Sequence, residues 1–493
     1  MDNEIFHKVT QGSYYMIIDQ AINYILGFLF WLVLAKLTVP AVLGQVMLTT
    51  AIAGIVLGFA GYGAQVTISK YVAEYNAKGM TNISKSVFAL GLKIGLIVIA
   101  IAATASVLFS SQLAAAFSSD SSLVGLIIVA MLIFLPSQTI IACFNGAFQG
   151  SHKMKYTALT DLIYQVARLF IAVVLIILGF ESLGVLLGFA FGSVIATICA
   201  YSLFLRKLFN NVTGTGSPTN LRHVVRFSAF NYLSVGLSTL SIQIGYLLLG
   251  IQSFDSVAVF GISALMSGVV GGIMVSVSRA IIPSTSEQWQ KEDKTGMNIM
   301  INTAFRLSII ASGFLYILLI IAPEQILTLL SDKYSIASSS LQILVVAAII
   351  SSLTGLFVSV LNGIGKPKHV AKIGVISSIA LIASSIVLIP LLRVEGAALS
   401  VFNGSLVGIS LSLYYFKKEH ILKISYGSLL KPVVSILLSL VVGFGISAIT
   451  GNILAALISS AIIYTLLIRT LRLVSYSEIS GLVHIATKSI RIK

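Results

Sequence analysis

The chain has 493 residues, of which 57% are hydrophobic and only 10% are charged. A soluble protein of this length carries about 25% charged residues, so the composition excludes a soluble globular protein and indicates a membrane protein. The net charge is +15 at pH 7, and the two cysteines, Cys143 and Cys199, both lie inside apolar runs, which argues against a disulfide framework and a Cys/His metal site.

Apolar runs long enough to cross a bilayer as helices recur along the whole chain. They lack the alternating pattern of membrane β-strands, so we predict an all-α polytopic membrane protein with about 14 transmembrane helices. We expect no cleavable signal peptide, because the first run is too long for one. In chain order, the predicted helices span 12–35, 43–66, 85–109, 122–148, 155–179, 183–205, 226–250, 256–280, 300–322, 337–361, 369–391, 395–416, 430–449 and 452–471.

Lysine and arginine are distributed unevenly between the predicted loops. If the N-terminus is cytoplasmic, most of the 31 basic residues and all 6 histidines fall on the cytoplasmic side. Lys36, Lys333 and Arg393 fall in loops on the opposite side. Cytoplasmic loops are normally the basic ones, so we predict a plasma-membrane protein with both termini in the cytoplasm. The positive charge then serves topology and contact with anionic lipids, and we expect no nucleic-acid partner.

Two short basic turns, GSHK at 150–153 and GKPK at 365–368, indicate an internal duplication. Because six predicted helices separate the equivalent points, we expect two six-helix lobes that are parallel repeats. Two further pairs of segments match at similar spacing: 184–193 with 396–405, and 41–44 with 258–261. The predicted domains are an N-lobe (1–207), a cytoplasmic linker (208–221), a C-lobe (222–418), two additional helices (430–472) and a cytoplasmic tail (473–493).

These features resemble the multidrug/oligosaccharidyl-lipid/polysaccharide exporter superfamily over about residues 1–418. The resemblance is carried by the two lobes, the glycine-marked start of the second helix, the basic segment AEYNAKG at 73–79, and the basic turns after the fourth and tenth helices. Fourteen helices suggest the polysaccharide-transporter or lipid II flippase branch, since the drug/cation antiporters usually have twelve. The resemblance implies transport by alternating access, without a cofactor.

Charged residues inside membrane helices are costly, so they are candidates for function. Arg168 is predicted to lie about 20 Å deep, near the middle of the bilayer. It is a candidate substrate ligand, and the alternative is an ion pair with Asp161 on the same helical face. Lys93, Arg306 and Lys372 lie within about 12 Å of the cytoplasmic surface, where long side chains can also reach the headgroups.

Asp19 lies near the start of the first helix, with Asn23 on the same face four residues later. The drug/cation antiporters of the resembled superfamily use acidic N-lobe residues to exchange H+ or Na+. Three roles therefore stay open for Asp19: ion coupling, with Asp161 as a second candidate, pairing with a basic residue in a cavity, or a position near the membrane interface.

Basic residues outnumber acidic ones among the deep sites, which favours an anionic substrate. Arginine suits bidentate phosphate contact, so we expect a polyprenyl phosphate or pyrophosphate that carries a sugar. Polar side chains would contact the sugar, although each is equally suited to bonds between helices. These candidates are Asn23, Tyr24, Gln138, Asn145, Asn231, Tyr232, Gln243 and Asn362.

We therefore interpret the chain as a flippase for a lipid-linked oligosaccharide in cell-surface polysaccharide assembly, acting as a monomer. The alternative is a cation-coupled multidrug exporter centred on Asp19. A membrane enzyme of glycan assembly is a remote third reading, because the longest predicted loops have about twenty residues and the sequence shows no paired carboxylates in a hydrolase context. GIGKPK lacks the Ser or Thr of a nucleotide-binding loop, so an ATPase site is not expected.

Overall fold

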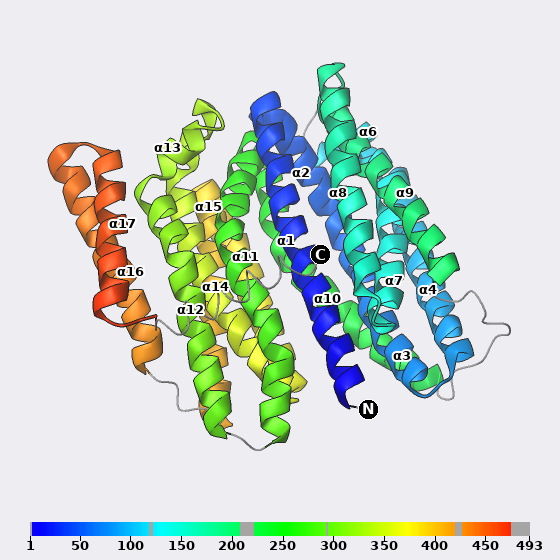
Figure 1. Ribbon diagram of the computed structural model, residues 1–493. Coiled ribbons are helices and arrows are strands. Elements are labelled where there is room, and N and C mark those ends of the chain that lie inside the picture. The colour runs from blue at the N-terminus through cyan, green and yellow to red at the C-terminus, as the bar shows by residue number, and fades with distance from the viewer. Residues whose placement is uncertain (1, 118–121, 208–220, 292–293, 420–425, 475–493) are drawn as a thin grey trace. The chain divides into compact units, whose positions relative to one another are not determined.

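The computed structural model describes residues 2–117, 122–207, 221–291, 294–419 and 426–474, and every regular element in these ranges is a helix (Figure 1). The all-α prediction is therefore confirmed. In chain order the elements are α1 (Asp2–Leu37), α2 (Pro40–Leu57), η1 (Gly58–Tyr62), α3 (Gly63–Ala77), α4 (Thr81–Leu108), α5 (Ser110–Ala115), α6 (Ser122–Val129), η2 (Ala130–Phe134), α7 (Leu135–Gly150), α8 (Met154–Ile177), α9 (Glu181–Lys207), α10 (Leu221–Gly250), α11 (Phe254–Gln290), α12 (Lys294–Ile321), α13 (Pro323–Thr328), η3 (Asp332–Ala337), α14 (Ser338–Gly363), α15 (Pro367–Lys418), α16 (Tyr426–Thr450) and α17 (Ile453–Thr470).

Among the described residues, 11 helices are long and apolar enough to span a membrane. One of them, α15, is interrupted at Arg393 (φ 51°, ψ −120°) and supplies two of the predicted helices, 369–391 and 395–416. Shorter apolar helices at Ile22–Leu37 and Val235–Gly250 account for two more. The prediction of about 14 transmembrane helices is therefore confirmed.

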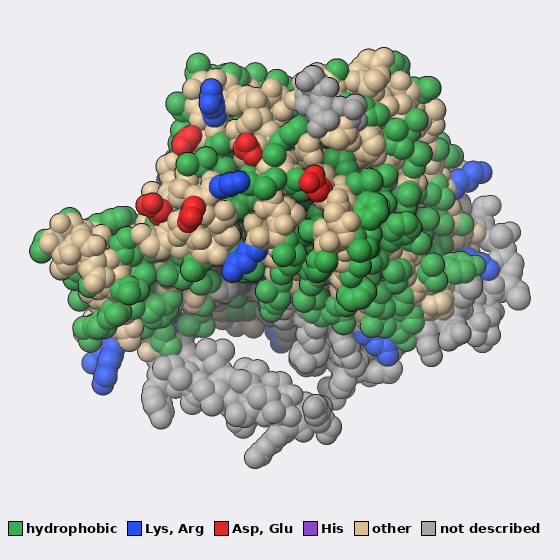
Figure 2. All heavy atoms as spheres, turned by 90° about the horizontal axis from the view of Figure 1, so that it is seen from above, with side chains coloured by type: hydrophobic (Ala, Val, Ile, Leu, Met, Phe, Trp, Pro, Cys, Tyr) green, Lys and Arg blue, Asp and Glu red, His purple; other side chains and the backbone are tan. Residues whose placement is uncertain are grey.

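The outer surfaces of these helices carry large apolar side chains. Phe170 and Ile101 are 70% and 67% exposed, although each would be strongly stabilised by leaving water. Figure 2 looks onto one end of the helices, where acidic and basic side chains are few and scattered, whereas Phe170 and Ile101 lie along α8 and α4. A surface of this kind is typical of helices that face lipid, and the chain is a multi-pass membrane protein.

The chain forms two compact units. Unit 1 comprises residues 1–265 and 374–404, and unit 2 comprises residues 266–373 and 405–493. Their boundaries lie within α11 and α15, whereas we expected the lobes to meet at the segment 208–221. The division into two six-helix lobes thus stays a prediction.

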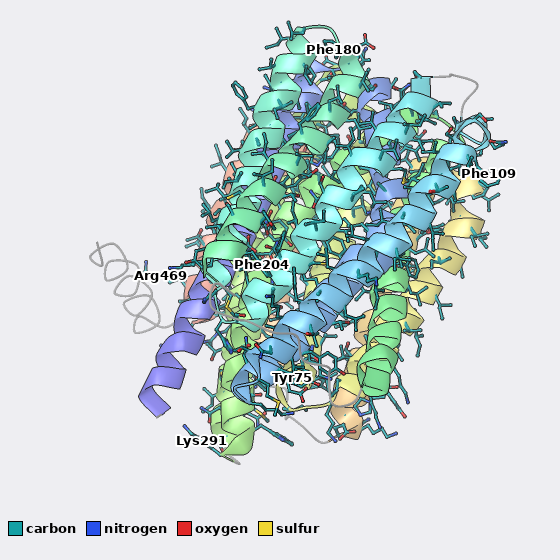
Figure 3. All side chains as sticks on the ribbon, turned by 90° about the vertical axis from the view of Figure 1, so that its right-hand side faces the viewer. Tyr75, Phe109, Phe180, Phe204, Lys291 and Arg469 are labelled. Atoms are coloured by element: carbon teal, nitrogen blue, oxygen red, sulfur yellow. The ribbon has the colours of Figure 1, made fainter. Side chains whose placement is uncertain are left out.

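The loops of unit 1 emerge at two opposite ends of its helices. Tyr75 lies where α3 leads into α4, and Phe109, directly after α4, lies at the other end of that helix (Figure 3). Phe180, between α8 and α9, lies at the same end as Phe109 (Figure 3). Successive helices therefore run back and forth, as a chain that crosses a membrane repeatedly must do.

Two long helices of unit 1 each contain a π-helical segment. The first, η1, lies between α2 and α3, and the second, η2, lies between α6 and α7. Pro136 is the second residue of α7, and only Leu135 separates it from η2. Proline has no backbone N–H and its ring crowds the preceding turn, so a wider turn before it is a physical consequence of the sequence.

The turns that open α8 and α15 have the same backbone hydrogen bonds. Lys153 N–H donates to Phe148 O (2.8 Å) and Lys366 N–H donates to Leu361 O (2.9 Å). Every corresponding pair of residues in the two turns is separated by 213 positions, as Lys153 is from Lys366. Alignment of GSHK with GKPK pairs Gly150 with Gly365. This alignment is two residues out of register with the one that the backbone hydrogen bonds define.

Helix packing beneath the two turns repeats at the same spacing. A Cβ atom on Gly150 would lie 2.5 Å from the carbonyl oxygen of Ser69, and one on Gly363 would lie 3.0 Å from that of Ile282. Ser69 and Ile282 are again 213 positions apart. In the first half a glycine at the end of α7 packs against the backbone of α3, and in the second half a glycine at the end of α14 packs against the backbone of α11. This equivalence supports the predicted duplication.

Candidate functional site

A cluster of polar side chains lies among the apolar helices of unit 1. It is built by α1, α7 and α8, and α8 packs along both of the others. On α8, Asp161, Gln165 and Arg168 are spaced four and three residues apart, so they share one face of the helix. Asp19 and Asn23 share a face of α1 for the same reason. The candidate site is thus assembled from helices far apart in sequence.

Hydrogen bonds join the two acidic residues to amide side chains. Asn23 Nδ2 donates to Asp19 Oδ1 (3.1 Å), and Gln165 Nε2 donates to Asn23 Oδ1 (2.7 Å). Asn145 Nδ2 donates to Asp161 Oδ1 (3.1 Å). Asp161 also interacts with Asp19. Two carboxyl groups inside the bundle are therefore close together, and three amides bond to them or to one another.

Two oxygen atoms of this cluster lack hydrogen-bond partners in the described part of the chain. They are Asn145 Oδ1 and Gln165 Oε1, and both are buried. An unpaired buried acceptor costs about 1–3 kcal/mol, so such atoms are expected to meet a water molecule or a ligand. With the neighbouring carboxylates they form a set of oxygen acceptors that suits a proton or a small hard cation.

Arg168 lies inside the protein, as its predicted depth requires, because its side chain is only 7% exposed. Its guanidinium carbon lies 4.3 Å from the ring centre of Phe30 and 5.1 Å from those of Tyr164 and Phe189. Aromatic faces at these distances attract a cation. The rings come from α1, α8 and α9, so three helices enclose one charge.

Glycine in α9 makes room for the backbone that carries Arg168. A Cβ atom on Gly192 would lie 2.8 Å from Arg168 N, which is too close for any other residue without a shift of the helices. Gly192 belongs to a run of glycines at every fourth position that the sequence shows as a packing motif. Packing of α9 thus helps to set the position of the guanidinium.

The predicted ion pair between Arg168 and Asp161 is one of two readings that the sequence leaves open. In the structure Asp161 contacts Asn145, Asn23 and Asp19, whereas Arg168 contacts aromatic rings. The two charged groups therefore have different immediate neighbours, although both belong to the same polar cluster.

Sequence reasoning missed two tyrosines of the cluster. Tyr164 lies four residues before Arg168 and interacts with both Arg168 and Gln138. Tyr62, in η1, lies near Tyr164 and Asp161. The spacing of Tyr164 from its charged neighbours could have identified it, since positions three and four residues apart face the same way. Nothing local in the sequence points to Tyr62.

The other candidate residues lie on other helices or in unit 2, except Tyr24, which follows Asn23 on α1. Lys93 on α4 and Lys372 on α15 are exposed, and Arg306 is half-buried on α12 in unit 2. Tyr24 is half-buried on α1. Gln243 packs against Gly54 of α2, and Asn362 is exposed at the end of α14. The side chains of Asn231 and Tyr232 lie outside the described residues.

Comparison of the sequence with known families gives two matches. The family described as polysaccharide biosynthesis protein matches residues 9–289, and the family described as MatE matches residues 229–387. One relative is the uncharacterized membrane protein MJ1068 of Methanocaldococcus jannaschii. It is 22% identical over 383 residues, which cover 73% of this chain and 75% of the relative.

Comparison with solved structures gives similar folds at low identity. The inward closed conformation of the lipid II flippase MurJ has a TM-score of 0.74 and 14% identity, covering 93% of this chain and 98% of that one. An inward-facing multidrug resistance MATE family transporter has a TM-score of 0.65 and 16% identity, covering 81% and 94%. The bent form of the Vibrio cholerae MATE transporter VcmN has a TM-score of 0.58 and 14% identity, covering 85% and 99%. These likenesses show a shared fold.

Proposed function

Because the chain belongs to the polysaccharide biosynthesis protein family, in the polysaccharide-transporter branch of the multidrug/oligosaccharidyl-lipid/polysaccharide exporter superfamily, we propose that it flips a lipid-linked oligosaccharide across the membrane. The cargo would be a polyprenyl phosphate or pyrophosphate that carries sugars. It would move from the inner to the outer leaflet of the plasma membrane by alternating access. The resemblance to a lipid II flippase supports a lipid-linked cargo, since that protein is named for one.

The enclosed guanidinium of Arg168 carries the proposal. The rings of Phe30 and Phe189 offset its charge through their faces and do not use the N–H groups in the guanidinium plane, whereas Tyr164 hydrogen-bonds to the guanidinium. Nε of Arg168 is buried without a hydrogen-bond partner among the described residues. A phosphate oxygen accepts such N–H groups in bidentate geometry. Arg168 would therefore hold the phosphate while the sugar passes the amides of the cluster.

Replacement of Arg168 tests this role. We expect Arg168→Ala to abolish flipping of a fluorescent lipid-linked oligosaccharide in proteoliposomes, because no other described residue supplies a buried guanidinium in unit 1. Arg168→Lys should retain part of the activity, since lysine keeps the charge but loses the planar fork. Arg469→Ala is the control, because Arg469 is an exposed arginine in the last turn of α17. Normal flipping by a well-folded Arg168→Ala protein would contradict the proposal.

The carboxyl cluster favours a second element of function, ion coupling. The pair Asp19 and Asp161, with the unpartnered oxygens of Asn145 and Gln165, suits a site for H+ or Na+. Such a site would drive flipping or, in the alternative reading, the export of cationic drugs. The MATE structural relatives support coupling in kind.

Asp19→Asn separates these readings. If Asp19 couples transport to an ion, the variant should flip substrate down its own gradient but no longer respond to an imposed H+ or Na+ gradient. Drug resistance in a sensitive host that depends on Asp19 would instead favour the multidrug exporter. Glu324→Gln, at an exposed residue of the short helix α13, provides a control carboxylate outside the cluster.

A further inference from the structure

The π-helical turn η1 interrupts the helix that α2 and α3 would otherwise form together. It spans Gly58–Tyr62, and its hydrogen bonds reach one residue further along the chain than those of an α-helix, which makes the turn wider. In the second half, α11 packs against Gly363 as α3 packs against Gly150, yet α11 is α-helical throughout Phe254–Gln290. Turns of this kind are rare and are frequent at functional sites, so η1 calls for a physical reason.

The last residue of η1 lies at the polar cluster of unit 1. Tyr62 interacts with Asp161 and Tyr164, both on α8. A phenol hydroxyl donates to an ionised carboxylate, whereas it can accept from a protonated carboxyl group. The contacts of Tyr62 therefore depend on the charge of the carboxyl groups beside it.

The first two residues of η1 lie against α10, a helix of the predicted C-lobe (222–418). A Cβ atom on Gly236 would collide with the ring of Phe59, so this glycine leaves a notch that the ring occupies. A Cβ atom on Gly58 would lie 2.6 Å from Cβ of Thr239. The same five-residue turn therefore contacts both the polar cluster and α10, and all of these residues belong to unit 1.

Close packing between α2 and α10 continues beyond η1. A Cβ atom on Gly54 would lie 3.0 Å from Nε2 of Gln243, and one on Gly250 would lie 2.7 Å from Cδ1 of Leu48. The two helices are thus in tight contact at several levels. Densely packed interiors transmit strain, so a change of shape in η1 is passed on to α10.

We propose that η1 transmits the charge state of the carboxyl cluster to α10, with Tyr62 as the positioning residue at the cluster and Phe59 as the positioning residue at α10. A π-turn becomes an α-turn when its hydrogen bonds shift by one residue, and this shift moves Phe59 relative to its notch. Gain or loss of a proton or a cation at the cluster changes the contacts of Tyr62 and biases the turn toward one arrangement. The proposal rests on the proposed ion-coupling role of the cluster and adds the route by which α10 responds.

Distances between spin labels on the full-length protein in detergent micelles test this route without an ion gradient or cargo. Both native cysteines are replaced by alanine, and labels are attached through Ile101→Cys on α4 and Ile242→Cys on α10, two exposed positions. Asp161→Asn removes the charge but keeps an oxygen that can accept from Asn145. We expect this variant to shift the mean distance between the labels. The control pair, Ile101→Cys with Ile198→Cys on α9, should keep its distance.

Variants of η1 distinguish transmission from general damage to the fold. Deletion of Ala60 removes the extra residue of the π-turn and leaves α2 and α3 in register as one α-helix. Phe59→Ala empties the notch on α10 instead, and Tyr62→Phe removes only the hydroxyl. In each background, Asp161→Asn should no longer shift the distance between α4 and α10, as a double-mutant cycle measures. Phe180→Ala, at an exposed phenylalanine outside η1, is the control and should leave the shift intact.

Two results would overturn the route through η1. One is an unchanged distance between α4 and α10 in Asp161→Asn, and the other is a shift that persists in the η1 variants, because the change would then reach α10 by another path. Either result together with loss of ion-driven flipping in Asp19→Asn would leave the proposed function standing without this route. A shift that requires η1, in a protein whose flipping ignores ion gradients, would support the route and reject ion coupling.

Discussion

A single arginine illustrates how much local sequence determines. The depth of Arg168 in its apolar run required it to face protein or water, and it is buried inside unit 1. No local pattern predicted its neighbours, because Phe30 and Phe189 come from two other helices, α1 and α9, which are more than a hundred residues apart from each other in the chain. Sequence thus predicts that a charge must be accommodated, and packing decides by which groups.

Gly192 provides a test at the scale of the residue. We expect Gly192→Ala to push α9 away from α8, because the new Cβ would meet backbone atoms of Arg168 within 3 Å. Overpacking of this kind costs about 1–3 kcal/mol, and it should also lower flipping by displacing the guanidinium. Thermal unfolding in detergent and the proteoliposome assay measure the two effects. Gly125→Ala is the control, since nothing lies within 4 Å of its Cβ position.

Helices were predictable as elements, whereas their irregularities were not. Long apolar runs predicted the positions of the membrane helices. No residue pattern predicted the π-helical segment η1, which contains Tyr62. The turn at 150–153 shows the same limit. Its letters match GKPK, yet the backbone pairs Lys153 with Lys366, because hydrogen bonding and not residue identity defines a turn.

The docking of α17 gives a prediction at the scale of the element. Tyr464 is fully buried against α12, and its hydroxyl donates to the carbonyl of Ile310 (3.0 Å). A Cβ atom on Gly313 would collide with that hydroxyl, so Gly313→Ala should loosen the α16–α17 hairpin and lower stability by about 1–3 kcal/mol. Limited proteolysis after α15 would detect the loosening. Gly445→Ala, at an open position on α16, should be neutral or slightly stabilising.

At the scale of the whole molecule, composition and loop charge predicted a multi-pass helical membrane protein, and the family follows from the comparisons. The grouping of helices into compact units was less accessible, because α11 and α15 each contribute to both units. A helix that spans two units has no boundary signal such as a polar linker. Of the predicted site residues, Asp19, Asn23, Asn145, Asp161 and Arg168 come together in unit 1, whereas Lys93 is exposed on α4 and Arg306 belongs to unit 2.

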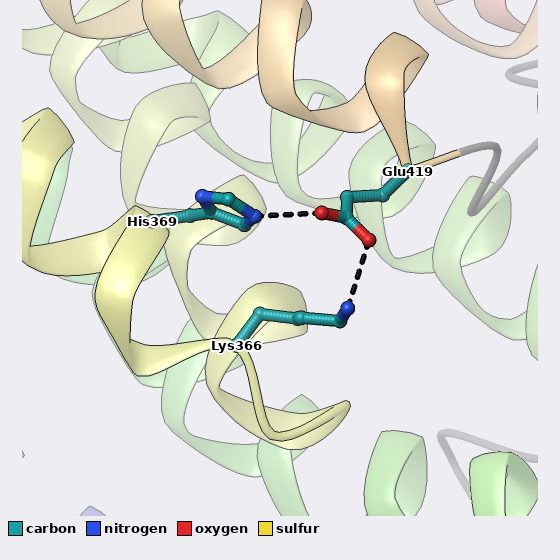
Figure 4. Close-up of polar contacts among 3 residues, drawn as sticks. All are labelled: Lys366, His369 and Glu419. Carbon is teal, nitrogen blue, oxygen red and sulfur yellow. Dashed lines mark hydrogen bonds and ion pairs between the residues drawn. The ribbon is translucent and has the colours of Figure 1, made fainter.

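The carboxyl group of Glu419, directly after α15, contributes to the dependence of stability on pH. Lys366, and then His369, lower the pKa of its carboxyl group by hydrogen bonding to the charged form (Figure 4). A lowered pKa contributes stability that is present above the unfolded value, about 4.3 for glutamate, and is lost as pH falls through the folded pKa. Thermal unfolding of Glu419→Gln should therefore depend less on pH below about pH 5 than that of the unaltered protein. Equal slopes for both proteins would rule out this contribution.

The two copies of the duplicated turn differ in the residue at their left-handed backbone position. The left-handed position is occupied by Gly365 (φ 76°) in the second copy, where it costs little, and by His152 (φ 55°) in the first. A residue with a Cβ atom pays about 1–2 kcal/mol for this conformation. The first copy of the turn therefore carries backbone strain that the second copy does not. A change to another backbone conformation would relieve this strain, so the first copy changes conformation at lower cost.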